Sequence, residues 1–176
     1  NVEAIVTRAP EALDAAGIPA AHVEDTPDTP TIASLVEISN SRPELRRTDR
    51  DWQAADTLKN VVVMQVALDG TRTPLIIGLP GDREVDLKRV EAAVHPVSIE
   101  AFEEEDFKKY PSLVKGYIGP QVLGLNSESG IKYLVDPRVV VGTRWITGAN
   151  SRGNHVYDLV AGRDFTWDGV IEAAEV

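Results

Sequence analysis

The sequence contains no cysteine, no long apolar run and comparatively little positive charge. Without cysteine there is no disulfide framework, no thiolate nucleophile and no thiolate metal ligand, which fits a reducing cytoplasm. No stretch approaches the ~18 consecutive apolar residues that a membrane-spanning helix needs. The first residues also lack the basic and apolar regions of a signal peptide. We therefore expect a cytoplasmic protein that has no membrane partner.

Positive charge is scarce because 18 lysines and arginines face 28 acidic residues, for a formal net charge of −10. This balance argues against broad electrostatic binding of nucleic acid, which depends on clustered basic side chains. Residues 42–50 are a local exception, with four arginines and two acidic residues. This segment is either a solvated loop or a small basic patch that contacts one RNA end.

Several catalytic motifs are also absent. The sequence has no His-Glu-x-x-His zinc motif, no Gly-x-Ser-x-Gly nucleophile turn and no Gly-x-x-x-x-Gly-Lys-Ser/Thr phosphate loop. A site with no metal and no obvious protein nucleophile remains. If the protein is an enzyme, its catalysis must come from positioning and electrostatics, or from a group on the substrate.

The size and composition are those of one ordinary globular domain. The chain has 176 residues, of which 43% are hydrophobic and 26% charged. It does not begin with methionine, so we interpret it as a processed product or as a piece of a longer protein.

Proline and glycine divide the chain into short elements. Residues 24–30, with two prolines, predict a rigid extended entry segment. Residues 58–68 are nearly all apolar and rich in valine, which predicts a buried central strand, and Asp69-Gly70 predicts a hairpin turn after it. The expected helices span 31–38, 84–94 and 103–109, and the expected strands span 58–68, 73–79, 131–135, 139–141 and 155–160. This mixed order predicts an α+β fold, with a mixed, mostly antiparallel sheet or a partly closed barrel flanked by short helices.

Lys59 is the first candidate site residue, because it lies within the most apolar strand. A buried ammonium group costs several kcal/mol unless it is paired. Lys59 therefore either points outward from a sheet with one solvated face, or contacts a phosphate or carboxylate from a rigid strand.

Two glycine-rich turns and one acidic residue supply the other candidates. Residues 148–155 run from Gly148-Ala149-Asn150 to His155, where a loop meets a strand and a side chain can line a pocket. The turn Gly119-Pro120 lets the backbone approach a ligand closely. Asp136 ends a strand before proline, a position where aspartate commonly caps a turn. Each of these three patterns is also explained by turn formation alone. The other two histidines, His22 and His95, are assigned no role.

Taken in order along the chain, these motifs resemble those of one family. The motifs are Thr26-Pro27, Leu58-Lys59-Asn60-Val61-Val62, Pro80-Gly81-Asp82-Arg83-Glu84-Val85, Ile118-Gly119-Pro120, Val135-Asp136, and Gly148-Ala149-Asn150 with His155. The series resembles the insertion domain of bacterial-type prolyl-tRNA synthetases, which belongs to the YbaK-type aminoacyl-tRNA deacylase superfamily. The resemblance covers residues 24–165. It implies that 1–23 and 166–176 are flanks from the synthetase core.

The resemblance implies post-transfer editing, the hydrolysis of alanine wrongly esterified to proline tRNA. By position, Lys59 engages the terminal adenosine or its phosphate, and Gly119 with Pro120 helps to place the ester and the attacking water. Asp136 lies near the pocket, the Gly148-Ala149-Asn150 turn belongs to its wall, and His155 shapes an alanine-sized space. A ribose hydroxyl next to the ester helps to activate the water.

The resemblance also implies partners and cofactors. No metal or cofactor is expected for editing, whereas the parent synthetase uses ATP and magnesium. The expected partners are the 3′ end of proline tRNA carrying alanine, the synthetase catalytic core and the anticodon-binding domain, with a homodimeric parent enzyme. Asn60 replaces a frequent threonine, and Tyr117-Ile118 replaces a common Ser-Leu, so the pocket shape differs in detail.

Two other interpretations stay open at this point. The chain could be a freestanding deacylase that acts in trans. It could instead be a non-catalytic insertion that binds tRNA or a partner, with Lys59 and His155 as structural residues.

Overall fold

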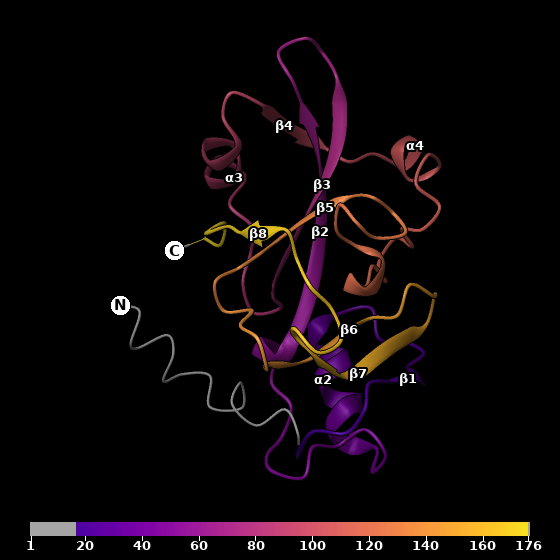
Figure 1. Ribbon diagram of the computed structural model, residues 1–176. Helices are drawn as coiled ribbons and strands as arrows, with labels where there is room; N and C mark the ends of the chain where they lie inside the picture. Colours follow the sequence, from indigo (N-terminus) through magenta and orange to yellow (C-terminus); the bar gives the residue numbers. More distant parts are fainter. Residues whose placement is uncertain (1–16, 176) are drawn as a thin grey trace.

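The computed structural model describes residues 17–175, which form one mixed sheet with short helices packed against it (Figure 1). The helical elements are α2 (Ile32–Ser41), η3 (Ala54–Asp56), α3 (Leu87–Val94), α4 (Glu104–Phe107) and η4 (Pro120–Val122). The strands are β1 (His22–Asp25), β2 (Thr57–Val66), β3 (Arg72–Pro80), β4 (Ser98–Ala101), β5 (Lys132–Val135), β6 (Arg144–Gly148), β7 (Asn154–Val160) and β8 (Gly169–Val170). Residues 1–16 of the expected N-terminal flank lie outside the described part.

The sheet follows the order β1-β7-β6-β2-β3-β5-β8, and β4 pairs with β2 outside this path. Four of the pairings are antiparallel, while β2 with β6, β3 with β5 and β5 with β8 are parallel. The expected α+β fold with a mixed, mostly antiparallel sheet is confirmed. The sheet is not closed into a barrel, because the two end strands β1 and β8 do not pair with each other.

The β2–β3 hairpin forms the long axis of the molecule (Figure 1). The elements α3, β4 and α4 lie around its turn, and α2, β1, β6 and β7 surround its other end. Residues along β3 alternate between two cores, with Leu75 and Ile77 in one cluster and Ile76 in another. All three are 0% exposed, because helices and loops cover both faces of this strand.

A third cluster attaches α2 to the sheet. Thr31 caps this helix by accepting a hydrogen bond from the backbone N–H of Ser34, and the buried Leu35 is its main contact. Leu35 packs in this cluster with Trp52 of the loop segment that follows the helix and with Ile146 of β6. The helix is therefore fixed against the central residues of β6 and β7, because Tyr157 of β7 belongs to the same cluster.

The expected strand at residues 139–141 is wrong. These residues form consecutive turns after β5, in which the Val139 N–H donates to the Asp136 carbonyl and the Asp136 side chain accepts from the Arg138 N–H at 2.8 Å. Pro137 starts the turn, so the chain leaves the sheet despite its three β-branched valines. Strands β1, β4, β6 and β8 were not predicted, since each is only two to five residues long.

The two-sided core predicts the first measurable effect. Replacing Ile76 by alanine removes a fully buried side chain between packed layers, so the free energy of unfolding should fall by about 2–5 kcal/mol. Val23 is 60% exposed on β1, and Val23→Ala should change stability by less than about 0.5 kcal/mol. Urea unfolding of both variants tests the difference. Equal losses would contradict the assignment of β3 as the central strand.

Candidate active site

A small cavity opens where the first residues of β2 meet β6, β7 and α2. Its volume is about 230 Å³. Seven of the lining residues are apolar or glycine and five have polar side chains: Ile32, Leu35, Thr57, Leu58, Lys59, Asn60, Gly116, Ile118, Ile146, Thr147, Gly148 and His155. The size is below the ~300–1,000 Å³ typical of pockets for drug-sized ligands, so the cavity suits a small group.

Strand pairing explains why distant residues meet here. The parallel pairing of β2 with β6 places Leu58 opposite Thr147. The antiparallel pairing of β6 with β7 places Gly148 opposite His155. The structure thereby brings together three of the predicted site residues, Lys59, Gly148 and His155.

His155 is a buried and uncharged wall of the cavity. Its side chain is only 7% exposed, and burial lowers its pKa to about 4. Nδ1 lies 2.7 Å from the hydroxyl oxygen of Thr26, and the Tyr117 ring lies 5.6 Å away between centroids. At neutral pH the imidazole is therefore uncharged. It contributes to the cavity the bulk of its ring and one neutral ring nitrogen.

Lys59 supplies the cationic group among the lining residues. Its side chain is 22% exposed, and Nζ lies 3.2 Å from Oε1 of Glu84, which is 77% exposed. An ion pair with so exposed a partner contributes little stability, because water screens it. The ammonium group is therefore directed to the cavity rim and can exchange its carboxylate partner for a ligand anion.

Gly119 and Gly148 hold two loops in contact behind the cavity. A Cβ on Gly148 would collide with the Tyr117 backbone, and a Cβ on Gly119 would collide with the Gly148 carbonyl oxygen. The Gly119 N–H donates to Oδ1 of Asn150 at 2.8 Å, and the Asn150 N–H donates to the Tyr117 carbonyl at 2.8 Å. Asn150 adopts φ 58°, a conformation that asparagine tolerates better than most residues.

Four predicted residues therefore support the cavity without lining it. Gly119 and Asn150 hold the two loops together, Pro120 begins η4, and Ala149 packs against the largest core cluster. Because the Gly119 N–H is already bonded to Asn150, it does not point at the space where a ligand would lie.

The structure does not bring Asp136 to this cavity. Its side chain is 1% exposed and pairs with the Arg138 guanidinium at 3.0 Å, and its N–H donates to the Gly78 carbonyl at 2.8 Å. These contacts close the turn after β5.

Four polar residues at or beside the cavity escaped prediction as site residues, one of which is Thr57 in its lining. Thr26 binds the His155 ring, Asn60 and Thr147 line the cavity, and the Asn60 amide donates to Thr147 at 3.2 Å. A second polar residue directly after Lys59 in an apolar strand was the available signal for Asn60. Thr147 carried no signal, because β6 itself was not predicted.

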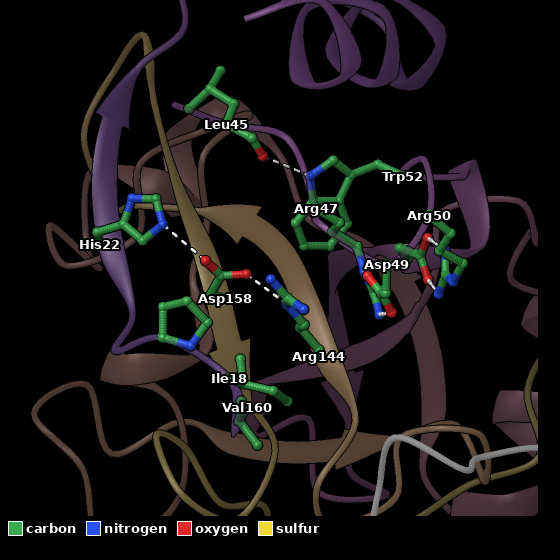
Figure 2. Close-up of polar contacts among 12 residues, drawn as sticks. Ile18, His22, Leu45, Arg47, Asp49, Arg50, Trp52, Arg144, Asp158 and Val160 are labelled. Atoms are coloured by element: carbon green, nitrogen blue, oxygen red, sulfur yellow. Dashed lines mark hydrogen bonds and ion pairs between the residues drawn. The ribbon is translucent and has the colours of Figure 1, made fainter. Parts of the chain in front are cut away.

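The arginine-rich segment 42–50 forms ion pairs within the domain (Figure 2). Arg47 is buried, its guanidinium group bonds the Asp49 carboxylate, and it lies 5.2 Å from the centre of the Trp52 ring. This bond holds the pKa of Asp49 well below its usual range. Since Arg42, Arg47 and Arg50 pair with carboxylates of the domain, most of the positive charge of this segment is used in internal contacts.

His22, which was assigned no role, joins the same network (Figure 2). Asp158 of β7 lies between it and Arg144, with contacts of 2.9 Å to His22 Nε2 and 2.6 Å to Arg144 Nε. Burial lowers the pKa of His22, but hydrogen bonds and charge attraction from Asp158 and Glu24 outweigh it, so the pKa is raised.

A second cavity of about 340 Å³ lies beside this network and is lined by four arginines. Three of them face carboxylates: Arg50 pairs with Asp56, Arg138 with Asp136, and Arg144 with Asp158. Asp82 and Glu172 also line it. The acidic groups offset the positive charge, so this cavity is a poorer anion site than the number of arginines suggests.

Within residues 17–175, no group of three or more metal-ligating side chains is placed to hold an ion. In the same part of the chain, no helix combines the length and apolar character required to cross a membrane.

Comparisons with known proteins define the family of the chain. Residues 26–165 match the family described as the aminoacyl-tRNA editing domain, and the chain belongs to this family. The whole chain is 66% identical over 176 residues to a proline–tRNA ligase of Kineococcus radiotolerans, and 59% identical over 177 residues to that of Cutibacterium acnes. The chain spans 30% of the length of each of these relatives.

A solved structure supports the fold at lower sequence similarity. It belongs to a protein assigned as a trans-editing enzyme for prolyl tRNA synthetase, with a TM-score of 0.55 and 14% identity over 86% of this chain and 84% of that chain. The resemblance to prolyl-tRNA synthetase editing domains is therefore confirmed at the level of family and fold.

The two histidines predict opposite pH effects on stability. The pKa of His155 falls from 6.5 to about 4 on folding, so between these values the unfolded chain binds the proton more tightly. Its burial should therefore lower the free energy of unfolding as pH drops from 6.5 towards 4, by up to about 3 kcal/mol. The raised pKa of His22 favours the folded state below pH 6.5, and this gain is lost as pH rises through the raised value.

Imidazole NMR titration with urea unfolding between pH 4.5 and 8 measures both effects. His155→Gln should remove the decline at acid pH, and His22→Gln should remove the gain there. An imidazole of His155 that titrates at pH 6.5 or above would contradict its buried neutral state.

Proposed function

We propose that this domain performs post-transfer editing, hydrolysing the ester that joins alanine to proline tRNA. The observation that carries the proposal is a small cavity with a single lysine at its rim, in an editing-family chain that aligns along its whole length with part of a proline–tRNA ligase. The aminoacylation reaction, which uses ATP and magnesium, would be carried out by the remaining 70% or so of such an enzyme, which this chain does not include.

The need for a second pocket follows from the energetics of selection. An apolar synthetic site rejects a smaller amino acid only by lost contacts, worth ~1–3 kcal/mol per methylene. A separate cavity that admits alanine and excludes proline supplies the missing discrimination. In this proposal Lys59 binds the terminal adenosine or its phosphate, and His155 limits the size of the aminoacyl group.

The hydrolytic step requires no protein nucleophile. A water molecule attacks the ester carbonyl, the bond to the ribose oxygen breaks, and free alanine and tRNA result. The adjacent ribose hydroxyl helps to activate that water. The protein contributes rigid placement of the ester in the cavity, whose wall includes Ile118 and Gly148, together with exclusion of bulk water.

The direct test is release of alanine from alanyl-tRNA(Pro) by the purified chain. Alanine should be released and proline should not, and Lys59→Ala should reduce kcat/KM by about 100-fold or more through loss of an oriented charge contact. Glu84→Ala removes the partner of Lys59 and should leave release intact. A wild-type chain inactive at high concentration would favour the non-catalytic binding alternative.

Salt dependence separates weak tRNA binding from poor chemistry. A chain of charge −10 with one rim lysine should show a high KM that rises steeply with salt, because the synthetase core and anticodon-binding domain would supply most phosphate contacts. A KM that stays constant from about 50 to 200 mM salt would contradict the expectation that this domain binds tRNA weakly and that other domains supply most phosphate contacts.

The size-selecting role of His155 gives a separate prediction. His155→Ala removes a buried ring from the cavity wall and should allow release of proline from prolyl-tRNA(Pro), while alanine release falls less than tenfold or so. Thr26→Val is the matched control, since it removes the hydroxyl next to Nδ1 but leaves the imidazole ring in the chain. Continued rejection of proline by His155→Ala would show that another residue sets the size limit.

A further inference from the structure

We infer that Asn60 is a positioning residue, which fixes the loop at residues 116–120 beside Lys59. The kinetic consequence rests on the proposed editing function. The structural consequence rests on geometry alone and is measured separately.

The Asn60 amide forms three hydrogen bonds to three different segments. Its Nδ2 donates to the Ile118 carbonyl at 2.8 Å and to the Thr147 hydroxyl at 3.2 Å, and its Oδ1 accepts from the Tyr133 hydroxyl at 2.6 Å. Since a carbonyl can only accept, the contact with Ile118 settles which end of the amide faces the loop. Both N–H groups of Asn60 are therefore used by the protein.

The hydrogen bonds from Asn60 to Tyr133 and Thr147 anchor its amide in the middle of the sheet. Tyr133 of β5 is 0% exposed, and burial raises its pKa, so its hydroxyl stays protonated and remains a donor. Gly78 of β3 leaves the room for this group, because a Cβ at Gly78 would collide with the Tyr133 hydroxyl oxygen. Thr147 of β6 in turn donates to the Leu58 carbonyl at 2.8 Å.

The hydrogen bond from Asn60 to the Ile118 carbonyl holds the cavity wall. Ile118 lines the cavity, and the next residue, Gly119, is held by Asn150 through its N–H. Two asparagine amides therefore fix successive residues of one loop, one from β2 and the other from the turn after β6. Without the donor at position 60, the Ile118 carbonyl would lose its link to the sheet, and the wall beside Lys59 could shift.

We expect substitution of Asn60 to lower kcat and to leave the affinity for the tRNA end nearly unchanged. Displacement of a reacting group by about 1 Å can cost about 100-fold in rate. Asn60 does not offer a free donor to the substrate, so the affinity for the tRNA end should change little.

The decisive variant is Asn60→Asp, which keeps the acceptor for Tyr133 but replaces the donor by a carboxylate oxygen facing the Ile118 carbonyl. We expect kcat for alanine release to fall about 10- to 100-fold with KM changed by less than about threefold. Hydrogen exchange in a peptide covering residues 114–122 should become faster. Asn126→Asp makes the same charge change at an exposed loop position and should leave kcat, KM and exchange unchanged. Tyr133→Phe keeps the bond to Ile118 and should lose less activity than Asn60→Asp.

Each result has a defined meaning. Unchanged kcat and exchange in Asn60→Asp would overturn the inference, and so would a rise in KM alone, which would indicate direct substrate contact. If Asn60→Asp does not fold, Asn60→Ser, which removes the reach to Ile118 without adding charge, must show the same faster exchange. If the wild-type chain releases no alanine, the proposed function fails, while the exchange comparison still decides whether Asn60 fixes the loop.

Discussion

The contact between the Gly148 turn and the loop around Gly119 is the constraint on which the rest of the site depends. No side chain fits at either position, because a Cβ on Gly148 would meet the Tyr117 backbone and a Cβ on Gly119 would meet the Gly148 carbonyl. The short parallel pairing of β2 with β6 sets where that contact occurs. One backbone approach thus fixes the distance between the wall that carries His155 and the wall beside Lys59. The cavity is a consequence of this packing and not of a flexible loop folding over a surface.

The hairpin and the fold class were predictable because their signals are local. A valine-rich strand, an Asp-Gly turn and a second apolar run predict β2 and β3 directly. The topology was not predictable in the same way, since the contact of Leu58 with Thr147 joins residues 89 positions apart. The valines at 139–141 show the reverse error, where strand propensity gave way to the turn made by Asp136 and Pro137.

The candidate site shows a similar division between residue type and position. Lys59 was identifiable because a buried ammonium group in an apolar strand is costly unless it is paired. His155 was identifiable because it follows a glycine-rich turn. Asp136 carried an equally visible pattern, yet its carboxylate binds Arg138 at the end of β5. Asn60 carried almost none, although its amide connects β2, β5, β6 and a loop. A sequence shows which side chains are chemically unusual, whereas pairing partners decide which of them share a cavity.

The distribution of charge explains how an acidic domain can still present a usable lysine. Arg47, Arg50, Arg138 and Arg144 are held by carboxylates inside the domain, which removes them from competition for an external anion. Lys59 differs because its partner Glu84 is 77% exposed and remains well solvated when the pair opens. Exchanging Glu84 for a phosphate would therefore cost little in the proposed reaction, and the strand keeps the lysine in place during the exchange. The same weak pair keeps the side chain near the cavity when no anion is bound, so binding needs only a change of partner.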